Sequence, residues 1–169
     1  MRALVVFLSV MLVIEVCAGA ASCLKTEHLF WIERSKNKNR VQYDVCLLPN
    51  RDLRNADPVV AYWVLENGKK EELSPLQGRY AYGIISQEKL DKNKLRITLA
   101  AFKDREIVIE RLDGDYRAII MIEGERTLLE RVYVMAEENP LGFPKISYVD
   151  IFGRILQTNQ PVKERVTPD

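Results

Sequence analysis

The amino-acid sequence predicts an all-β fold, a single-domain antiparallel β-sandwich or barrel of about nine to ten short strands. Residues 95–101 alternate their side chains with the period of a half-buried strand. Residues 59–65 form an unbroken apolar run, which is typical of a central strand buried on both faces. The dipeptides Asp-Gly at 113–114 and Glu-Gly at 123–124 are typical of two-residue hairpin turns.

These two turns predict a three-stranded meander over residues 105–132. With two-residue turns, Glu110 faces Arg117 and Arg117 faces Glu130, which places a charge ladder across the three strands. Cross-strand pairs of opposite charge contribute roughly 0.2–1 kcal/mol each, and a one-residue slip would scatter them. The same register aligns the residues of the other face, Ile107 with Ile120 and Thr127, and Ile109 with Ala118 and Leu129.

The other expected strands are separated by turn signals rich in Gly, Pro, Asn and Asp. These signals lie at 34–40, 49–58, 66–79, 88–94, 102–105, 137–144 and 153–160. A short helix fits residues 69–77, ahead of a break at Gly78. Pro58 can stand only at the edge of the strand that follows it, because proline donates no ladder hydrogen bond.

Residues 1–20 are expected to be a secretory signal peptide, followed by one all-β domain over 21–169. Arg2 precedes an apolar run at 3–14, and Ala-Gly-Ala at 18–20 supplies the small residues that a signal peptidase needs. The run is shorter than the roughly 20 apolar residues of a membrane-spanning helix. We therefore expect an exported protein, periplasmic or extracellular, with no transmembrane span in its mature chain.

Cys23 and Cys46 have three alternative roles. An oxidising compartment permits a disulfide between them. Cys46 lies in an apolar strand pattern, so it is alternatively a buried thiol that packs as a small hydrophobe. Cleavage after Ser22 would instead leave Cys23 first in the chain and open to lipid attachment, although Ala20 stands where lipoprotein signals prefer a large aliphatic residue.

The segment 34–40 reads Arg-Ser-Lys-Asn-Lys-Asn-Arg and has two interpretations. It is either a solvated hairpin turn, since asparagine tolerates the left-handed backbone of a turn, or a site for an anion. The candidate ligand-binding residues for the second interpretation are Arg34, Asn37, Asn39 and Arg40. Arginine forks and asparagine amides together suit a carboxylate, a phosphate or a sugar.

Three aromatic residues, Tyr62, Trp63 and Tyr82, are the candidates for lining an apolar cavity. In a closed barrel such residues can enclose a small ligand. The alternative is that their rings simply fill the core.

Composition and motifs argue against several functions. The chain has 25 Lys and Arg against 24 Asp and Glu, so its charge gives no case for a nucleic-acid partner. His28 is the single histidine, and a zinc site usually needs three or four ligands. There is no GxSxG, P-loop or GxGxxG motif. No metal or cofactor is therefore expected, and catalytic residues are not assigned.

Several stretches together resemble a family of exported bacterial proteins known as domain of unknown function 4833. They are FWIERSKNKNRVQYD, NADPVVAYWVLENG, RYAYGI, RVYV and PKISYVDIFG. The resemblance covers about residues 28 to 165, and its most specific parts are Arg34-Ser35-x-Asn37-x-Asn39 and Tyr62-Trp63. It implies export and a bacterial envelope setting, and it implies no activity, ligand or catalytic residue.

The expected function is that of an exported, non-enzymatic protein with a binding or envelope-structural role. Its partner would be an envelope component or a small anionic ligand. One alternative is a small-molecule binder with an apolar barrel cavity. Another is an enzyme whose carboxylates come together only in the fold.

Overall fold

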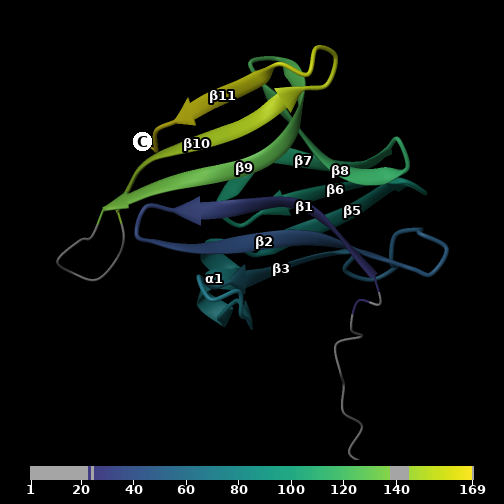
Figure 1. The fold of residues 1–169 in the computed structure, drawn as a ribbon, viewed down its shortest axis with the longest axis horizontal. Coiled ribbons are helices and arrows are strands. Elements are labelled where there is room, and N and C mark those ends of the chain that lie inside the picture. The colour runs from purple at the N-terminus through teal and green to yellow at the C-terminus, as the bar shows by residue number, and fades with distance from the viewer. Residues whose placement is uncertain (1–22, 24, 138–144, 169) are drawn as a thin grey trace, which may run out of the picture.

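The computed structural model of the protein describes residues 23, 25–137 and 145–168, which form one long curled sheet and a short helix (Figure 1). The predicted all-β class is confirmed. The elements, in chain order, are β1 (Lys25–Arg34), β2 (Asn37–Leu47), β3 (Val59–Val64), β4 (Lys70–Glu72), α1 (Pro75–Tyr80), β5 (Ile84–Asp91), β6 (Lys94–Leu99), β7 (Phe102–Leu112), β8 (Asp115–Ile122), β9 (Glu125–Glu137), β10 (Lys145–Ile155) and β11 (Pro161–Val166).

The strands pair in the order β4-β3-β2-β1-β9-β8-β7-β6-β5, and β10 pairs with both β9 and β11. Neighbouring strands are antiparallel except β1 and β9, which run parallel with Trp31 opposite Arg131 and Arg34 opposite Val134. The sheet is therefore mixed, where a purely antiparallel one was expected. Only local alternation is visible in a sequence, so it could not show that two distant segments pair in parallel.

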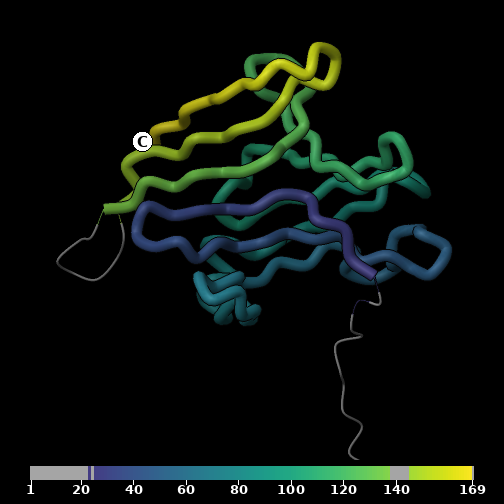
Figure 2. The backbone as a smooth tube through the Cα atoms, in the orientation of Figure 1, coloured from purple at the N-terminus to yellow at the C-terminus, as the bar shows by residue number. Residues whose placement is uncertain are grey.

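The sheet curls until its two ends meet, which the continuous tube of Figure 2 makes easy to follow. The contact between β3 and β5 is made by a side chain: the Val59 amide donates to Gln87 Oε1 (2.9 Å), and Gln87 Nε2 donates back to the Val59 carbonyl (3.0 Å). The Gln87 amide thus replaces the pair of hydrogen bonds that a neighbouring strand would make. The arrangement is closer to a barrel than to a two-sheet sandwich.

One hydrophobic core fills the inside of the curl. Phe30 of β1 stacks on Tyr43 of β2 with ring centroids 4.4 Å apart, and both side chains are completely buried. Buried residues from β1, β2, β3, β6, β7, β8, β9 and β10 belong to the same cluster. The Tyr43 hydroxyl donates to the Tyr82 carbonyl (2.6 Å), which satisfies its polar end.

Both predicted hairpin turns are confirmed, and with them the meander β7-β8-β9. Asp113 and Gly114 have φ of 50° and 91°, and Glu123 and Gly124 have φ of 51° and 82°. Positive φ at both central residues is the requirement of a type I′ turn, which matches the twist of the strands on either side. Gly supplies this backbone geometry without steric cost.

The predicted charge ladder is right in its first pair and wrong in its second. Glu110 faces Arg117 across β7 and β8. The pairing of β8 with β9 ends at Ile119 with Leu128, because β9 then turns to pair with β1. Glu130 instead accepts a hydrogen bond from Arg154 of β10 (2.8 Å).

The single described helix, α1, begins at a capping box. Ser74 Oγ accepts from the Gln77 amide (3.3 Å), and Gln77 Oε1 accepts from the Ser74 amide (3.0 Å). The helix was expected at 69–77 and lies later, with Gly78 inside it rather than after it. No helix in the described ranges is long and apolar enough to cross a membrane.

Gly83 follows α1 and lies against the backbone of Gly78 within that helix. A Cβ atom on Gly83 would lie 1.8 Å from the Gly78 carbonyl oxygen, a backbone atom that cannot rotate away. We expect Gly83→Ala to lower the free energy of unfolding by about 1–3 kcal/mol, as overpacking does. Urea denaturation followed by circular dichroism measures this change.

Gly78→Ala is the matched control, since a Cβ atom there has no neighbour within 4 Å. Alanine is favoured over glycine within a helix, so this variant should be at least as stable as the wild type. Equal stabilities for the two variants would contradict the close approach at Gly83.

Candidate functional site

The basic segment 34–40 is mostly strand rather than turn. Its turn consists of Ser35 and Lys36 alone, and β2 already begins at Asn37. The expectation of a long solvated turn is therefore wrong in extent. The pairing of β1 with β2 is irregular between Glu33 and Arg34, and side chains replace the missing strand hydrogen bonds there.

The two asparagines of this segment hold the backbone. Asn37 Oδ1 accepts from the Asn39 amide (3.1 Å), and Asn39 Oδ1 accepts from the Glu66 amide (3.0 Å). The Lys38 amide in turn donates to Glu66 Oε1 (3.0 Å). These bonds connect the start of β2 to the turn after β3, so the amide oxygens are already occupied and do not converge on a ligand.

Arg34 and Arg40 lie on opposite faces of the sheet. The Arg34 guanidinium lies 4.6 Å from the ring centroid of Trp63, whose side chain points into the core. The Arg40 guanidinium lies 5.2 Å from the ring of Trp31 on the outer face. The four residues proposed as one anion site are therefore not brought together.

Trp63 belongs to the core and Tyr82 to its open end. Trp63 is 6% exposed, and its indole Nε1 donates to Gln77 Oε1 of α1 (3.1 Å). The Tyr82 ring meets the Trp63 ring edge-on, with centroids 5.3 Å apart. The core-filling alternative thus holds for Trp63, while half-buried Tyr82 separates it from an open space.

That space is a groove of about 490 Å³ at one end of the curled sheet. Tyr82 lines it, as the cavity interpretation expected, whereas Tyr62 and Trp63 do not. The remaining lining is mainly apolar and comes from many elements, including Ile32, Leu99, Phe102, Val132, Val134 and Val149. Its volume falls in the range of roughly 300–1,000 Å³ that small-molecule sites occupy.

The rim of the groove combines exposed apolar residues with charges. Tyr80 of α1 and Ile146 of β10 are 67% and 40% exposed. Arg105 of β7 also lines the groove and forms a bidentate ion pair with Glu164 of β11. This ion pair joins the β10-β11 ribbon to the rest of the wall.

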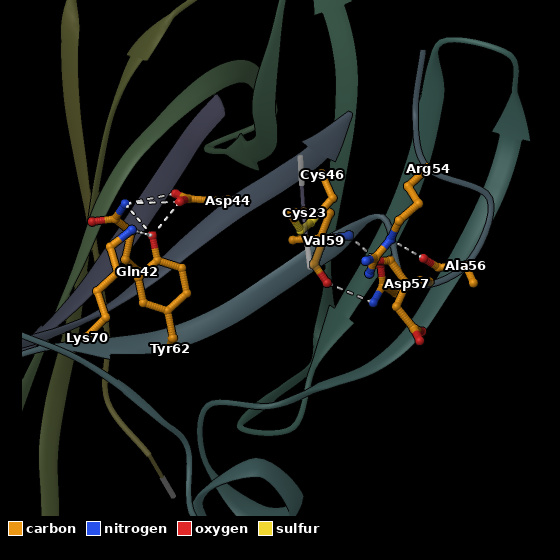
Figure 3. The surroundings of a disulfide bond; sticks show 11 residues. Cys23, Gln42, Asp44, Cys46, Arg54, Ala56, Asp57, Val59, Tyr62 and Lys70 are labelled. Atoms are coloured by element: carbon orange, nitrogen blue, oxygen red, sulfur yellow. Dashed lines mark hydrogen bonds between the residues drawn. A yellow bond between two sulfur atoms is a disulfide. The ribbon is translucent and has the colours of Figure 1, made fainter. Parts of the chain in front are cut away.

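Tyr62 lies in a polar cluster on the outer face of β1, β2 and β3 (Figure 3). Its hydroxyl donates to Asp44 Oδ2 (2.5 Å) and accepts from Lys70 Nζ (2.9 Å). Gln42 Nε2 lies 2.9 Å from Asp44 Oδ1 and 3.0 Å from the Tyr62 hydroxyl, and His28 Nδ1 lies 3.1 Å from Asp44 Oδ1. Asp44 is only 3% exposed, so these bonds replace its contacts with water.

The contacts within the cluster shift the pKa values of Asp44 and Tyr62. Burial alone would raise the pKa of Asp44, but hydrogen bonds from His28, Tyr62 and Gln42 outweigh it and hold the pKa below its usual value. Burial, together with the neighbouring carboxylate, raises the pKa of Tyr62. The cluster contains one carboxylate, so it does not supply the two facing carboxylates of a glycosidase-like site.

Asp44 was not predicted as part of any site, although the sequence carries a signal for it. It is the one charged residue in the strand stretch 41–47, whose other members are mostly apolar. A charge in such a stretch requires partners, because an isolated buried carboxylate is strongly unfavourable.

A disulfide joins Cys23 to Cys46, with a Cα–Cα distance of 5.3 Å (Figure 3). It fastens the chain just before β1 to the end of β2, at the open end of the β1-β2 hairpin. A sulfur atom in a disulfide cannot also carry a thioether-linked lipid, so the disulfide and the lipid attachment expected for Cys23 exclude each other, and the structure has the disulfide. Among the residues that the structure places, no three His, Cys, Asp or Glu side chains converge as metal ligands.

The profile of the family described as "Domain of unknown function (DUF4833)" matches residues 30–165. The chain belongs to this family. Neither a curated protein nor a solved structure matches the chain. The DUF4833 region includes Arg34, Asp44 with its cluster partners other than His28, and all of the groove except its last C-terminal residues.

Proposed function

We propose that the protein is an exported, non-enzymatic binding protein that holds a small apolar ligand in the groove at the end of its sheet. The observation that carries this proposal is the groove itself, about 490 Å³ in volume and lined mainly by apolar side chains. Protein interiors are normally packed to the density of organic crystals. An open apolar space of this size therefore needs an explanation, and a ligand provides one.

The rim supports the same conclusion. Tyr80 and Ile146 expose large apolar surfaces next to the groove. Contiguous exposed apolar surface on a monomeric protein commonly marks a binding site. A ligand in the groove would cover part of this surface and gain the free energy of removing it from water.

Export is part of the proposal for two reasons. Residues 1–20 have the composition of a secretory signal, although they lie outside the described residues. The disulfide between Cys23 and Cys46 suits an oxidising compartment, since cytosolic thiols are normally kept reduced.

Titration with N-phenyl-1-naphthylamine, a neutral apolar dye whose fluorescence rises in an apolar environment, tests the groove. We expect the wild-type protein to bind the dye saturably. Ala101 is exposed and lines the groove, so Ala101→Trp should fill the space and weaken binding at least about tenfold, or about 1.4 kcal/mol.

Ala56→Trp is the matched control, because Ala56 is also exposed and does not line the groove. This variant should bind the dye as the wild type does. Equal dye binding by the Ala101 and Ala56 variants, or no saturable binding by the wild type, would refute the groove as the binding site.

A further inference from the structure

We propose that the ligand is a single-chain amphipathic carboxylate, whose apolar tail lies in the groove and whose head group binds the guanidinium of Arg34. This inference rests on the proposed function, because it concerns the ligand of the same groove. It adds the chemical class of the ligand and the residue that would bind the head group. The apolar lining alone gives neither.

Arg34 lies beside the groove, although it does not line it. Ile32, two residues earlier on the same face of β1, lines the groove, and so does Val134, which pairs with Arg34 across β1 and β9. On its other side the Arg34 guanidinium stacks 4.6 Å from the Trp63 ring, which contacts the groove residue Tyr82. Arg34 therefore borders groove-lining residues both along β1 and across to β9, and its guanidinium contacts a ring that packs against a third.

Among the described residues, the Arg34 guanidinium has no partner of opposite charge. Its Nε atom is buried and has no hydrogen-bond acceptor, and no carboxylate within the described part of the chain pairs with it. Glu33, the adjacent acid, lies on the outer face, where it accepts from Trp31 Nε1 (2.7 Å) and lies 3.5 Å from Arg131. The Nε atoms of Arg51 and Arg96 are also buried without an acceptor, but both of those guanidinium groups pair with carboxylates. Within the described ranges Arg34 has neither an acceptor for Nε nor a paired carboxylate, and a buried donor without any partner is uncommon in folded proteins.

A carboxylate is the partner that this geometry favours. The Trp63 ring holds one face of the guanidinium, which leaves the in-plane N–H donors for an acceptor. A carboxylate matches the planar fork of arginine with two parallel hydrogen bonds. Because the ring already restricts the arginine, binding loses less side-chain freedom than it would at a solvated arginine.

The test compares decanoate with decan-1-ol, two ligands with the same apolar chain, as competitors of N-phenyl-1-naphthylamine on the purified protein. We expect decanoate to displace the dye at a concentration about tenfold lower than decan-1-ol, as a charge-assisted hydrogen bond predicts. Arg34→Met keeps an unbranched side chain against Trp63 and removes the charge. It should abolish the preference for decanoate and leave displacement by decan-1-ol unchanged.

Arg40→Met is the matched control, since Arg40 also lies over a tryptophan but on the opposite face. It should keep the preference for decanoate. Equal displacement by both ligands in the wild type, or an unchanged preference in Arg34→Met, overturns the role of Arg34 while leaving the groove as a binding site. Displacement by neither ligand, together with a failure of Ala101→Trp to affect the dye, overturns the proposed function as well.

Discussion

Replacing Asp44 by alanine should lower the free energy of unfolding by about 3 kcal/mol, because hydrogen bonds to a charged group are worth about 1.5–3 kcal/mol each and are not additive. The change leaves the Tyr62 hydroxyl, His28 and Gln42 without the acceptor that they share. Asp44→Asn should cost less, since it keeps the size of the side chain and part of its hydrogen bonding. Urea denaturation at neutral pH measures both variants.

Asp104→Ala serves as the control, because Asp104 is an exposed carboxylate on β7 without a hydrogen bond or ion pair within the described residues. Its stability should stay within about 0.5 kcal/mol of the wild type. A loss for Asp44→Ala no larger than that of this control would contradict the structural role of the cluster.

Replacing Asp44 by asparagine should also change how the free energy of unfolding depends on pH. The pKa of Asp44 is lowered in the folded protein, so its contribution is present above the unfolded value of about 4 and is lost as pH falls through the folded value. The difference in stability between the wild type and Asp44→Asn should therefore shrink in acid. Asp150, whose pKa is lowered chiefly by hydrogen bonds from Arg165, should keep part of the acid dependence in the variant.

Loss of the disulfide is the second large expected effect. Replacing Cys23 by serine and Cys46 by alanine should lower the free energy of unfolding by about 3 kcal/mol, because the bond closes a loop with a sequence separation of 23 residues and restricts the unfolded chain. Reduction of the wild type with dithiothreitol should produce a similar loss. Denaturation of both proteins with and without reductant measures this effect.

The double variant also supplies the control, since its stability should not respond to the reductant. A wild type that is equally stable in the oxidised and reduced states would show that the bond contributes nothing to the fold. Cys46→Ala also leaves a small cavity at a fully buried position. The free energy of unfolding of the double variant should therefore be lower than that of the reduced wild type.

Local features of the fold could be predicted from the sequence, and distant pairings could not. The turns at 113–114 and 123–124 follow from two dipeptides whose backbone preferences are strong. The parallel contact of β1 with β9 has no local signature, and it is the reason that β9 leaves β8 before Glu130 reaches Arg117. The ladder prediction therefore failed where a third strand competed for the same partner.

The candidate site shows the same division. Tyr82 lines the groove, as its residue type suggested, but the expected grouping of Arg34 with Arg40 was wrong because these two residues lie on opposite faces. The groove is made by residues of several strands and of the turn between β6 and β7. Their convergence depends on the curl of the whole sheet. Residue patterns along one strand contain no information about that curl.

The parallel pairing of β1 with β9 also governs how the chain can fold. Trp31 meets Arg131 about a hundred residues later, so closing this contact carries the entropy loss of a long loop. Folds dominated by such distant contacts fold slowly, in milliseconds to seconds. Until β9 reaches β1, the β1-β2 hairpin keeps the β1 edge unpaired. A bond between Cys23 and Cys46 would hold the open end of that hairpin together in the interval, because it links the chain before β1 to the end of β2.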